Sequence, residues 1–428
     1  MKTRPKLLFA DKQGNIYDHP QLEMVGSSGP SIQRPERDDL VPLPGLSRLY
    51  YHPDCPPYGY DPQKDRIVLL KQTKIGKKTI RCNAVSAFIQ QGWVRQFLPA
   101  MDCSLKNYTL PMWAYSAVGF ADDRYYVPAF EIDDNFRWNP ENFDDRDLLP
   151  KVEKRLNQFP DNRLVKHLER CALEYHCFAA KNFFLRRWEA PIPTSPTCNS
   201  GCLGCISLQP DSGCIPPQER IRFVPDLHEI TDPFFRHLNE AQDPIISFGQ
   251  GCEGEPIMQW QRISEAIAAI RKKTFRGTIN LNTNGSVPQW VRSICQSGLD
   301  SIRISLSSAQ EHLYNKYYLP QGYCFEDVLE SIRTARDQGV FTMINYLIFP
   351  GITDQEEEVA ALRSVIQKTR PHLIHLKNLN IDPDFYLKAM GAPHKPGLGI
   401  KKVKNLLESE FPEMQFGYYN RTRESFFG

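Results

Sequence analysis

The stretch Pro196-Thr-Cys-Asn-Ser-Gly-Cys-Leu-Gly-Cys205 carries three cysteines, Cys198, Cys202 and Cys205, in a C-x3-C-x2-C spacing. Its proline and two glycines predict a loop rather than a helix. A [4Fe–4S] cluster normally takes four cysteine ligands, so a loop with three leaves one iron open to a ligand that is not protein. The spacing therefore predicts three metal ligands and a reactive open iron. A zinc site completed by Cys214 is the alternative interpretation, because structural zinc is four-coordinate.

The length of 428 residues fits either one large α/β domain with a smaller module or two to three ordinary domains. The 52 Lys+Arg and 50 Asp+Glu leave a net charge of +2, so no global field favours nucleic acid or an anionic membrane. The N-terminal apolar run stops at Asp11, and no stretch approaches the roughly 18 apolar residues of a membrane span. We expect a cytoplasmic protein with no membrane partner, whose twelve cysteines are reduced thiols.

The pattern of residues changes near Trp188. Before it, short β-like runs at 66–71, 109–118 and 125–132 alternate with charged turns, and leucines recur at helical intervals toward the end. The predicted domains are a strand-rich N-terminal module with a Pro-rich arm (1–145), a helical connector (146–188), an α/β domain (189–400) and a C-terminal tail (401–428).

Strands and helices alternate along the α/β domain, which predicts a mostly parallel sheet covered by helices. The strand candidates are 244–248, 278–283, 300–307, 340–349 and 373–380, and the clearest helices are 258–273 and 325–338. A short strand before the cysteine loop brings the count to about six β/α units, fewer than the eight of a closed barrel. The predicted fold is a partial (β/α)6 barrel.

Polar residues line one face of two of these strands. Asn280 and Asn282 oppose Ile279 and Leu281, and the strand 301–307 alternates in the same way. A strand in a closed, dry barrel should be apolar on both faces, so these polar faces predict a lumen that holds a polar ligand. An exposed antiparallel sheet with one solvated face is the alternative.

The cysteine loop resembles the cluster loop of the radical S-adenosylmethionine (radical SAM) superfamily. Three later stretches resemble that family's motifs in the expected order: Gly254-Glu255-Pro256, Asn282-Thr283-Asn284-Gly285, and Ile344 to Asp354 with its Pro-Gly-x-Thr-Asp exit. In that family the methionyl amino and carboxylate groups of SAM chelate the open iron. Reductive cleavage of SAM then gives a 5'-deoxyadenosyl radical that abstracts hydrogen from a substrate. The resemblance implies a [4Fe–4S] cluster and SAM as cofactors.

The resemblance also implies which residues contact SAM: Gly254, Glu255, Asn282, Thr283, Asn284, Ser305, Ser307, Asn345 and Ile352. Two positions depart from the family pattern. Glu253 stands where the first glycine of Gly-Gly-Glu-Pro is usual, and Gly204 replaces an aromatic residue that contacts adenine, a role left to Ile206 or the Ile352 turn. Thr353 or Asp354 is expected to cap the following helix.

Further cysteines and the substrate side give weaker signals. The spacing of Cys55, Cys82, Cys103, Cys171 and Cys177 is irregular, which favours ordinary structural cysteines over a second cluster. Cys214 and Cys252 are candidate hydrogen donors, with a buried thiol as the alternative. Substrate-side candidates on the last predicted strand are Lys377, Asn378, Asn380 and Asp382.

The primary hypothesis is a single-cluster radical SAM enzyme. It lacks the cysteine-rich C-terminal extension of many peptide-modifying members, because no cysteine follows Cys324. Its expected partners are an electron donor such as a flavodoxin or ferredoxin and a peptide or small-metabolite substrate, in preference to RNA. The rival is a non-catalytic iron–sulfur or zinc protein for electron transfer or sensing, which binds metal without cleaving SAM.

Overall fold

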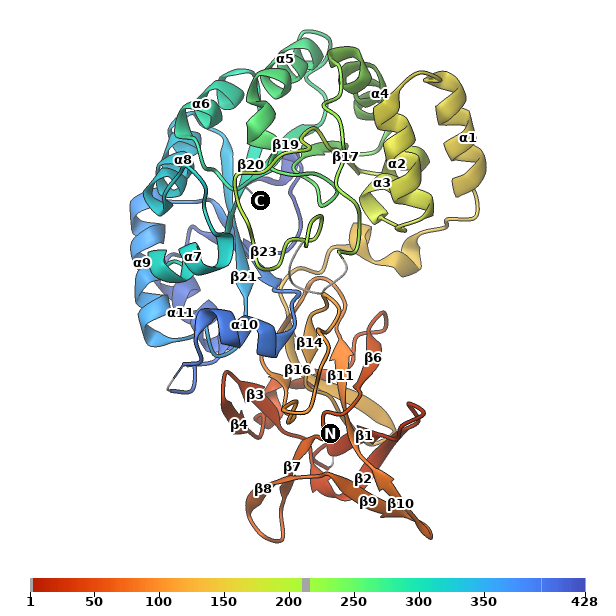
Figure 1. Cartoon of the computed structure of the whole chain (residues 1–428). Coiled ribbons are helices and arrows are strands. Elements are labelled where there is room, and N and C mark those ends of the chain that lie inside the picture. The colour runs from red at the N-terminus through yellow and green to blue at the C-terminus, as the bar shows by residue number, and fades with distance from the viewer. Residues whose placement is uncertain (1–2, 210–215, 394, 428) are drawn as a thin grey trace. The chain divides into compact units, whose positions relative to one another are not determined.

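Short antiparallel strands form the N-terminal part of the chain (Figure 1). The computed structural model describes residues 3–209, 216–393 and 395–427. The strands of this part are β1 Lys6–Ala10, β2 Ile16–Glu23, β3 Gly26–Ser28, β4 Ser31–Gln33, β5 Leu40–Pro42, β6 Arg48–His52, β7 Tyr58–Asp61, β8 Arg66–Leu69, β9 Gln72–Ile75, β10 Lys78–Arg81, β11 Asn83–Phe88, β12 Trp93–Arg95, β13 Leu98–Pro99, β14 Tyr115–Ser116, β15 Gly119–Ala121 and β16 Arg124–Glu131. The predicted strand-rich module is confirmed, although the run predicted at 109–118 shrinks to β14.

A small aliphatic core holds these strands together. β1 pairs antiparallel with β2, β11 and β15, and Leu8, Val85 and Val127 meet in one buried cluster. Cys55 and Cys103 form a disulfide beside this sheet. The expectation that all twelve cysteines are reduced is therefore wrong for this pair, since irregular sequence spacing gave no sign that the two thiols meet.

Three helices connect the strand-rich part to the α/β part: α1 (Leu148–Gln158), α2 (Arg163–Leu173) and α3 (Phe178–Leu185). On α2, Leu164, Leu168 and Cys171 are buried on one face, in keeping with helical periodicity. The side chain of Asn162 accepts the Val165 N–H at 2.9 Å and caps the helix N-terminus.

A seven-stranded sheet forms the α/β part. Its strands lie in chain order: β17 Glu189–Ile192, β18 Ile245–Phe248, β19 Thr278–Thr283, β20 Ser301–Leu306, β21 Phe341–Ile348, β22 Leu373–Asn378 and β23 Gln415–Gly417. The pairs β17–β18, β18–β19, β19–β20, β20–β21 and β22–β23 are all parallel. Strand positions were predicted to within a residue or two, but β23 was missed because its three residues carry no periodic signal.

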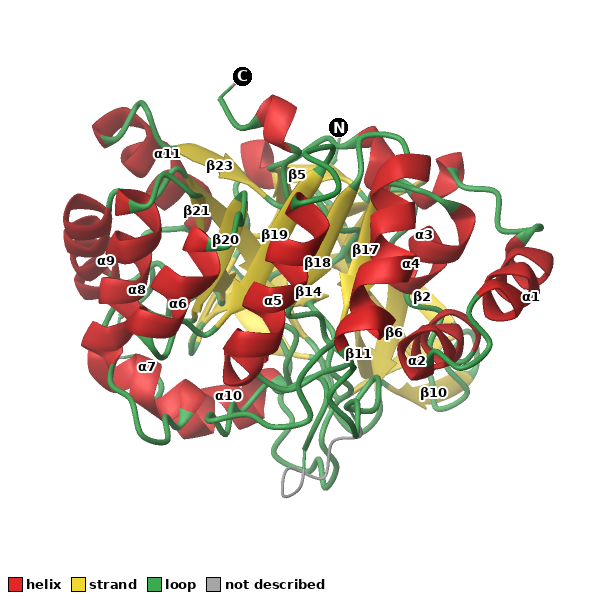
Figure 2. Cartoon of the chain, turned by 90° about the horizontal axis from the view of Figure 1, so that it is seen from above, coloured by secondary structure: helices red, strands yellow, loops and turns green. Residues whose placement is uncertain are grey.

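Helices cover one face of this sheet, where α4, α5, α6 and α8 follow one another along its outside (Figure 2). The helix bounds are α4 Leu227–Glu240, α5 Trp260–Arg271, α6 Pro288–Gln296, α7 Glu311–Tyr318, α8 Phe325–Asp337, α9 Glu356–Thr369, α10 Pro383–Met390 and α11 Ile400–Glu410. Ile246, Ile279 and Ile302 on neighbouring strands are fully buried, and alternation along each strand places Ser247, Asn280 and Ser301 on the opposite face.

Two compact units divide the chain. The first joins Met1–Asp134 with Leu347–Leu362 and Leu376–Pro412, and the second joins Asn135–Tyr346 with Arg363–His375 and Glu413–Gly428. The domain boundaries drawn from the sequence remain a prediction. Within the described residues, every helix is too short or too polar to cross a bilayer.

Candidate functional site

The cysteine loop rests on the end of α7. The backbone N–H of Gly201 donates to the Tyr318 carbonyl at 2.9 Å, and that of Leu203 donates to the Tyr317 carbonyl at 2.9 Å. The side chain of Asn284, just beyond β19, donates to Asn199 Oδ1 at 2.8 Å. The loop is thus fixed from two sides, which holds its cysteines in place without using their sulfur atoms.

The three predicted metal ligands lie within electrostatic range of one another. Burial raises the pKa of Cys198 to about 11, with the Glu255 charge adding to the rise. Burial also raises the pKa of Cys202, and the neighbouring Cys198 and Cys205 raise it further. Arg220 donates to Cys205 Sγ at 3.6 Å. Three soft sulfur donors within electrostatic range of one another, with one cation beside Cys205, fit an anionic iron–sulfur group, whose iron would keep the thiols deprotonated.

Gly204 departs from the family pattern for a steric reason. A Cβ at this position would lie 2.6 Å from the Tyr317 hydroxyl oxygen. Tyr317 is buried on α7 and occupies the space that a side chain at 204 would need. Glycine at position 204 therefore leaves room for the Tyr317 side chain of α7.

Glu255 is buried at the carboxyl ends of β18 and β19 and links the Gly-Glu-Pro and Asn-Thr-Asn-Gly turns. Its Oε1 accepts the Thr283 hydroxyl at 2.5 Å, and its Oε2 accepts the Asn284 N–H at 2.8 Å. Burial raises the pKa of Glu255 to about 7, while hydrogen bonds from Thr283, Ile257 and Asn284 act in the opposite direction. The structure therefore brings Glu255, Thr283 and Asn284 together beside the cysteine loop.

Gly254 is needed because the chain passes close to the segment that leads into the cysteine loop. Its N–H donates to the Ser195 carbonyl at 2.7 Å, and a Cβ would clash with the Thr197 carbonyl oxygen. The Glu255 N–H donates to the same Thr197 oxygen at 2.8 Å. The predicted turn and the predicted metal loop are thus adjacent.

Glu253 has a role that the sequence pattern did not indicate. Its Oε2 accepts the backbone N–H groups of Thr194 and Ser195 at 2.8 and 3.1 Å, and its Oε1 accepts those of Gly249 and Gln250 at 2.7 and 2.9 Å. The carboxylate therefore joins the loops that follow β17 and β18. Burial raises the pKa of Glu253 to about 7 against these donors. The glycine usual at this position could not make this link.

A chain of polar side chains crosses the inner face of the sheet. Ser301 donates to Asn280 Oδ1 at 2.8 Å, and Asn280 donates to Asn282 Oδ1 at 3.0 Å. Ser247 donates to Glu189 Oε1 at 2.6 Å, at the β17 end of this chain. Asn282 itself donates to the Phe248 carbonyl at 3.0 Å. These contacts bear out the predicted polar face. They also show that the Asn282 side chain mainly holds neighbouring strands together.

Two predicted contacts have buried polar atoms that lack protein partners. Ser307 Oγ, just beyond β20, and Asn345 Oδ1 on β21 are buried with no hydrogen-bond partner within the described parts of the chain. Ser305, which pairs with Asn345 across the two strands, is half-buried. A buried polar atom without a partner costs about 1–3 kcal/mol, so both atoms fit hydrogen bonds to a bound polar ligand.

Other predicted residues lie elsewhere. Ile352 belongs to the first unit, whereas the cysteine loop belongs to the second. Cys214 lies outside the described residues. In the first unit, Asn378 accepts the Arg95 N–H at 3.0 Å and Asp382 pairs with Lys106 at 2.6 Å, so these substrate-side candidates make fold contacts. Asp354 accepts the Gly351 and Gly399 N–H groups; α9 begins only at Glu356, which corrects the predicted cap.

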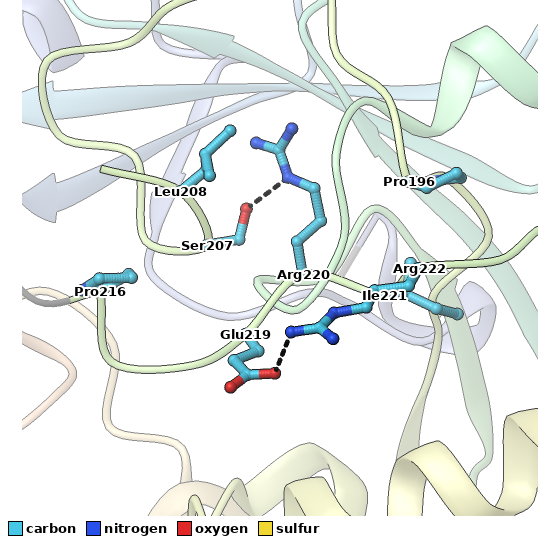
Figure 3. Close-up of a pocket in the computed structure, with 8 residues that line it drawn as sticks. All are labelled: Pro196, Ser207, Leu208, Pro216, Glu219, Arg220, Ile221 and Arg222. Carbon is cyan, nitrogen blue, oxygen red and sulfur yellow. Dashed lines mark hydrogen bonds and ion pairs between the residues drawn. The ribbon is translucent and has the colours of Figure 1, made fainter. Parts of the chain in front are cut away.

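A pocket of about 490 Å³ flanks the cysteine loop (Figure 3). Arg220 points across it and donates to Ser207 Oγ at 3.1 Å, while Arg222 pairs with Glu219 at 3.3 Å. The exposed Leu208 and the proline Pro196 supply apolar lining. Its mixed lining, with a cation beside Cys205, suits a polar or anionic group next to the loop.

The chain matches known proteins over part of its length. Residues 192–362 match the family model of the Radical SAM superfamily. An uncharacterized protein of Methanocaldococcus jannaschii is 24% identical over 225 residues, covering 48% of this chain and 68% of that protein. A probable GTP 3',8-cyclase of Pyrobaculum aerophilum is 26% identical over 166 residues, covering 39% of this chain and 49% of that protein, so the chain spans about half its length.

Among solved structures, methylornithine synthase (PylB) is similar with a TM-score of 0.39 and 16% identity, covering 64% of this chain and 76% of that one. The enzyme anSMEcpe with bound AdoMet gives a TM-score of 0.40 and 16% identity, covering 54% and 64%. Residues 192–362 of this chain therefore form a domain of the radical SAM superfamily.

Proposed function

We propose that this protein is a single-cluster radical SAM enzyme that cleaves SAM reductively and abstracts hydrogen from a peptide or small metabolite. Cys198, Cys202 and Cys205 would hold the [4Fe–4S] cluster. When bound, the cluster supplies the electron that breaks SAM. The observation that carries the proposal is the adjacency of this loop to Glu255 and Asn284, through hydrogen bonds to residues 195–200.

The chain's own residues would bind and orient SAM. Glu255 is held by Thr283 and the Asn284 N–H and can accept a hydrogen bond from an ammonium group at this edge. Ser307 Oγ and Asn345 Oδ1 would gain partners from the ligand. Gly254, Asn282 and Ser305 complete the proposed contacts. The proposed sheet shape is a partial (β/α)6 barrel whose polar face surrounds these groups.

Glu189 and Arg303 suggest how a substrate could be bound. Both lie on the polar face of the sheet and are joined through Asn420, which donates to Glu189 Oε1 at 2.7 Å and accepts from Arg303 at 3.3 Å. Burial lowers the pKa of Arg303, and the Glu189 charge opposes that effect. A paired carboxylate and guanidinium match a substrate with both charges, such as an amino acid or peptide terminus. A flavodoxin or ferredoxin is the proposed electron donor.

The test is SAM cleavage by the anaerobically reconstituted full chain. With SAM and dithionite, we expect 5'-deoxyadenosine from the wild type and none from Cys202→Ala. Cys295→Ala, which alters a buried cysteine of α6, is the matched control and should retain the activity. Bound iron without any nucleoside product would instead favour an electron-transfer or sensor protein.

A further inference from the structure

A second group of metal-ligand side chains lies apart from the cysteine loop. His167 and Cys171 on α2 and Cys252 in the loop after β18 bring one nitrogen and two sulfurs within 4.8 Å of one another. Cys171 and Cys252 are buried and His167 is half-buried. The proposed SAM chemistry uses none of the three, so their convergence needs a separate explanation.

The geometry of this group suits one tetrahedral ion. Two ligands bound to zinc at about 2.3 Å (sulfur) and about 2.05 Å (nitrogen) with a tetrahedral angle lie about 3.6 Å apart. His167 Nε2 and Cys171 Sγ are separated by 3.6 Å, as neighbours four residues apart on one helix face. The Phe223 ring packs edge-on against the imidazole, with centroids 6.5 Å apart, and restricts its orientation.

A candidate for the fourth ligand lies at the start of α3. The Cys177 N–H donates to the Cys171 carbonyl at 2.9 Å, which brings the Cys177 backbone beside the group. The Cys177 thiol is not among the three groups that already converge, so it would have to turn toward the ion. Three cysteines and one histidine form one of the usual ligand sets of structural zinc.

We propose that His167, Cys171, Cys177 and Cys252 bind a structural Zn²⁺ ion. The ion would join the connector helices to the loop that carries Glu253 and Glu255, because Cys252 directly precedes Glu253. The Cys252 carbonyl already accepts the Ile221 N–H at 2.7 Å, which fixes the backbone of this loop from a second side. Zinc would therefore stabilise the loop independently of any cluster.

The experiment separates this site from the cysteine loop. The full-length Cys198→Ala/Cys202→Ala/Cys205→Ala variant removes the iron–sulfur ligands, and metal analysis should still find about one zinc per chain. In that background, Cys171→Ser, Cys177→Ser and Cys252→Ser should each lose the zinc, while Cys295→Ala should keep it. Retained zinc in the serine variants, or iron in its place, would overturn the proposal.

The His167→Ala variant tests the site with less risk of misfolding, because this side chain is only half-buried. Chelator competition on the folded fraction should show zinc affinity weakened by more than about 100-fold, because removing a direct ligand should cost more than removing a group that only hydrogen-bonds a ligand. Cobalt substitution should give the absorption of a tetrahedral thiolate-bound ion, which the alanine variant lacks. A Cys171–Cys252 disulfide in metal-free protein from cells, with no zinc taken up after reduction, would contradict the proposal. These outcomes do not depend on SAM cleavage.

Discussion

Single side chains at the proposed SAM site divide into those that hold the fold and those that remain free for a ligand. Ser301 and Asn280 bond each other across the sheet, whereas Ser307 Oγ and Asn345 Oδ1 are buried without partners in the described chain. The strand alternation predicted Ser301, Asn280 and Ser307 as polar inward residues, and the family resemblance implied Asn345 as a SAM contact. The alternation could not separate the two classes, because that depends on distances between strands.

Ser307→Ala is predicted to weaken SAM binding without weakening the fold. Removing a buried hydroxyl that has no protein partner costs the folded state nothing, whereas the lost ligand hydrogen bond should raise the SAM Kd about 10-fold. Isothermal titration and urea unfolding measure the two effects. Ser301→Ala is the control: its hydroxyl bonds Asn280, so it should lower the unfolding free energy by about 1 kcal/mol. Unchanged SAM affinity in Ser307→Ala would contradict the assigned contact.

Gly204→Ala is predicted to destabilise the cysteine loop by about 1–3 kcal/mol, because the new methyl group meets the Tyr317 hydroxyl. Tyr317→Phe removes that oxygen and should restore much of the loss in the double variant. Denaturant unfolding and the iron retained after reconstitution provide the measurements. Tyr323→Phe, which removes a hydroxyl bonded to Ser200 instead, should give no rescue. Equal effects of the two tyrosine changes would refute this steric explanation.

At the scale of elements, the sequence predicted the parallel strands and their covering helices because each repeats a clear period. Contacts between elements were harder to predict. Glu253 looked like a defect in a glycine motif, yet it joins the loops after β17 and β18. Cys171 and Cys252 are remote in sequence and converge only through the packing of α2 against the β18 loop.

The helix α4 provides a pH-dependent test of packing. His237 is buried there, and its Nε2–H donates to the Trp188 carbonyl at 2.9 Å. Burial lowers its pKa from 6.5 to about 4. The unfolded chain therefore binds more protons between these values, so the stabilisation is complete above pH 6.5 and is lost as the pH falls toward 4.

The expected loss is about 3 kcal/mol of unfolding free energy over that window. Urea unfolding between pH 4 and 7 should show a shallower pH dependence for His237→Gln than for the wild type. His312→Gln, at an exposed position on α7, should follow the wild type. If the unfolding free energy of His237→Gln followed pH in parallel with the wild type, this histidine would not be the source of the pH dependence.

For the whole molecule, the α/β class and the strand-rich N-terminal module were predictable from the pattern of strand-like and helix-like segments and from the order of the motifs. The Cys55–Cys103 disulfide, the strand β23 and the two-unit division were not, because each depends on segments that meet only after folding. The motifs gave the chemistry through their order along the chain. The structure adds the hydrogen bonds that join the Gly-Glu-Pro and Asn-Thr-Asn-Gly turns to the cysteine loop.

The most direct test of the central claim is electron paramagnetic resonance of the full chain, reconstituted without oxygen, reduced with dithionite and recorded before and after SAM. An iron–sulfur cluster with one open iron should contain about four iron atoms per chain and change its spectrum when SAM binds. Cys202→Ala should lose both the iron and the signal. An iron-free protein with zinc on Cys198, Cys202 and Cys205, or a cluster spectrum that SAM leaves unchanged, would contradict the account.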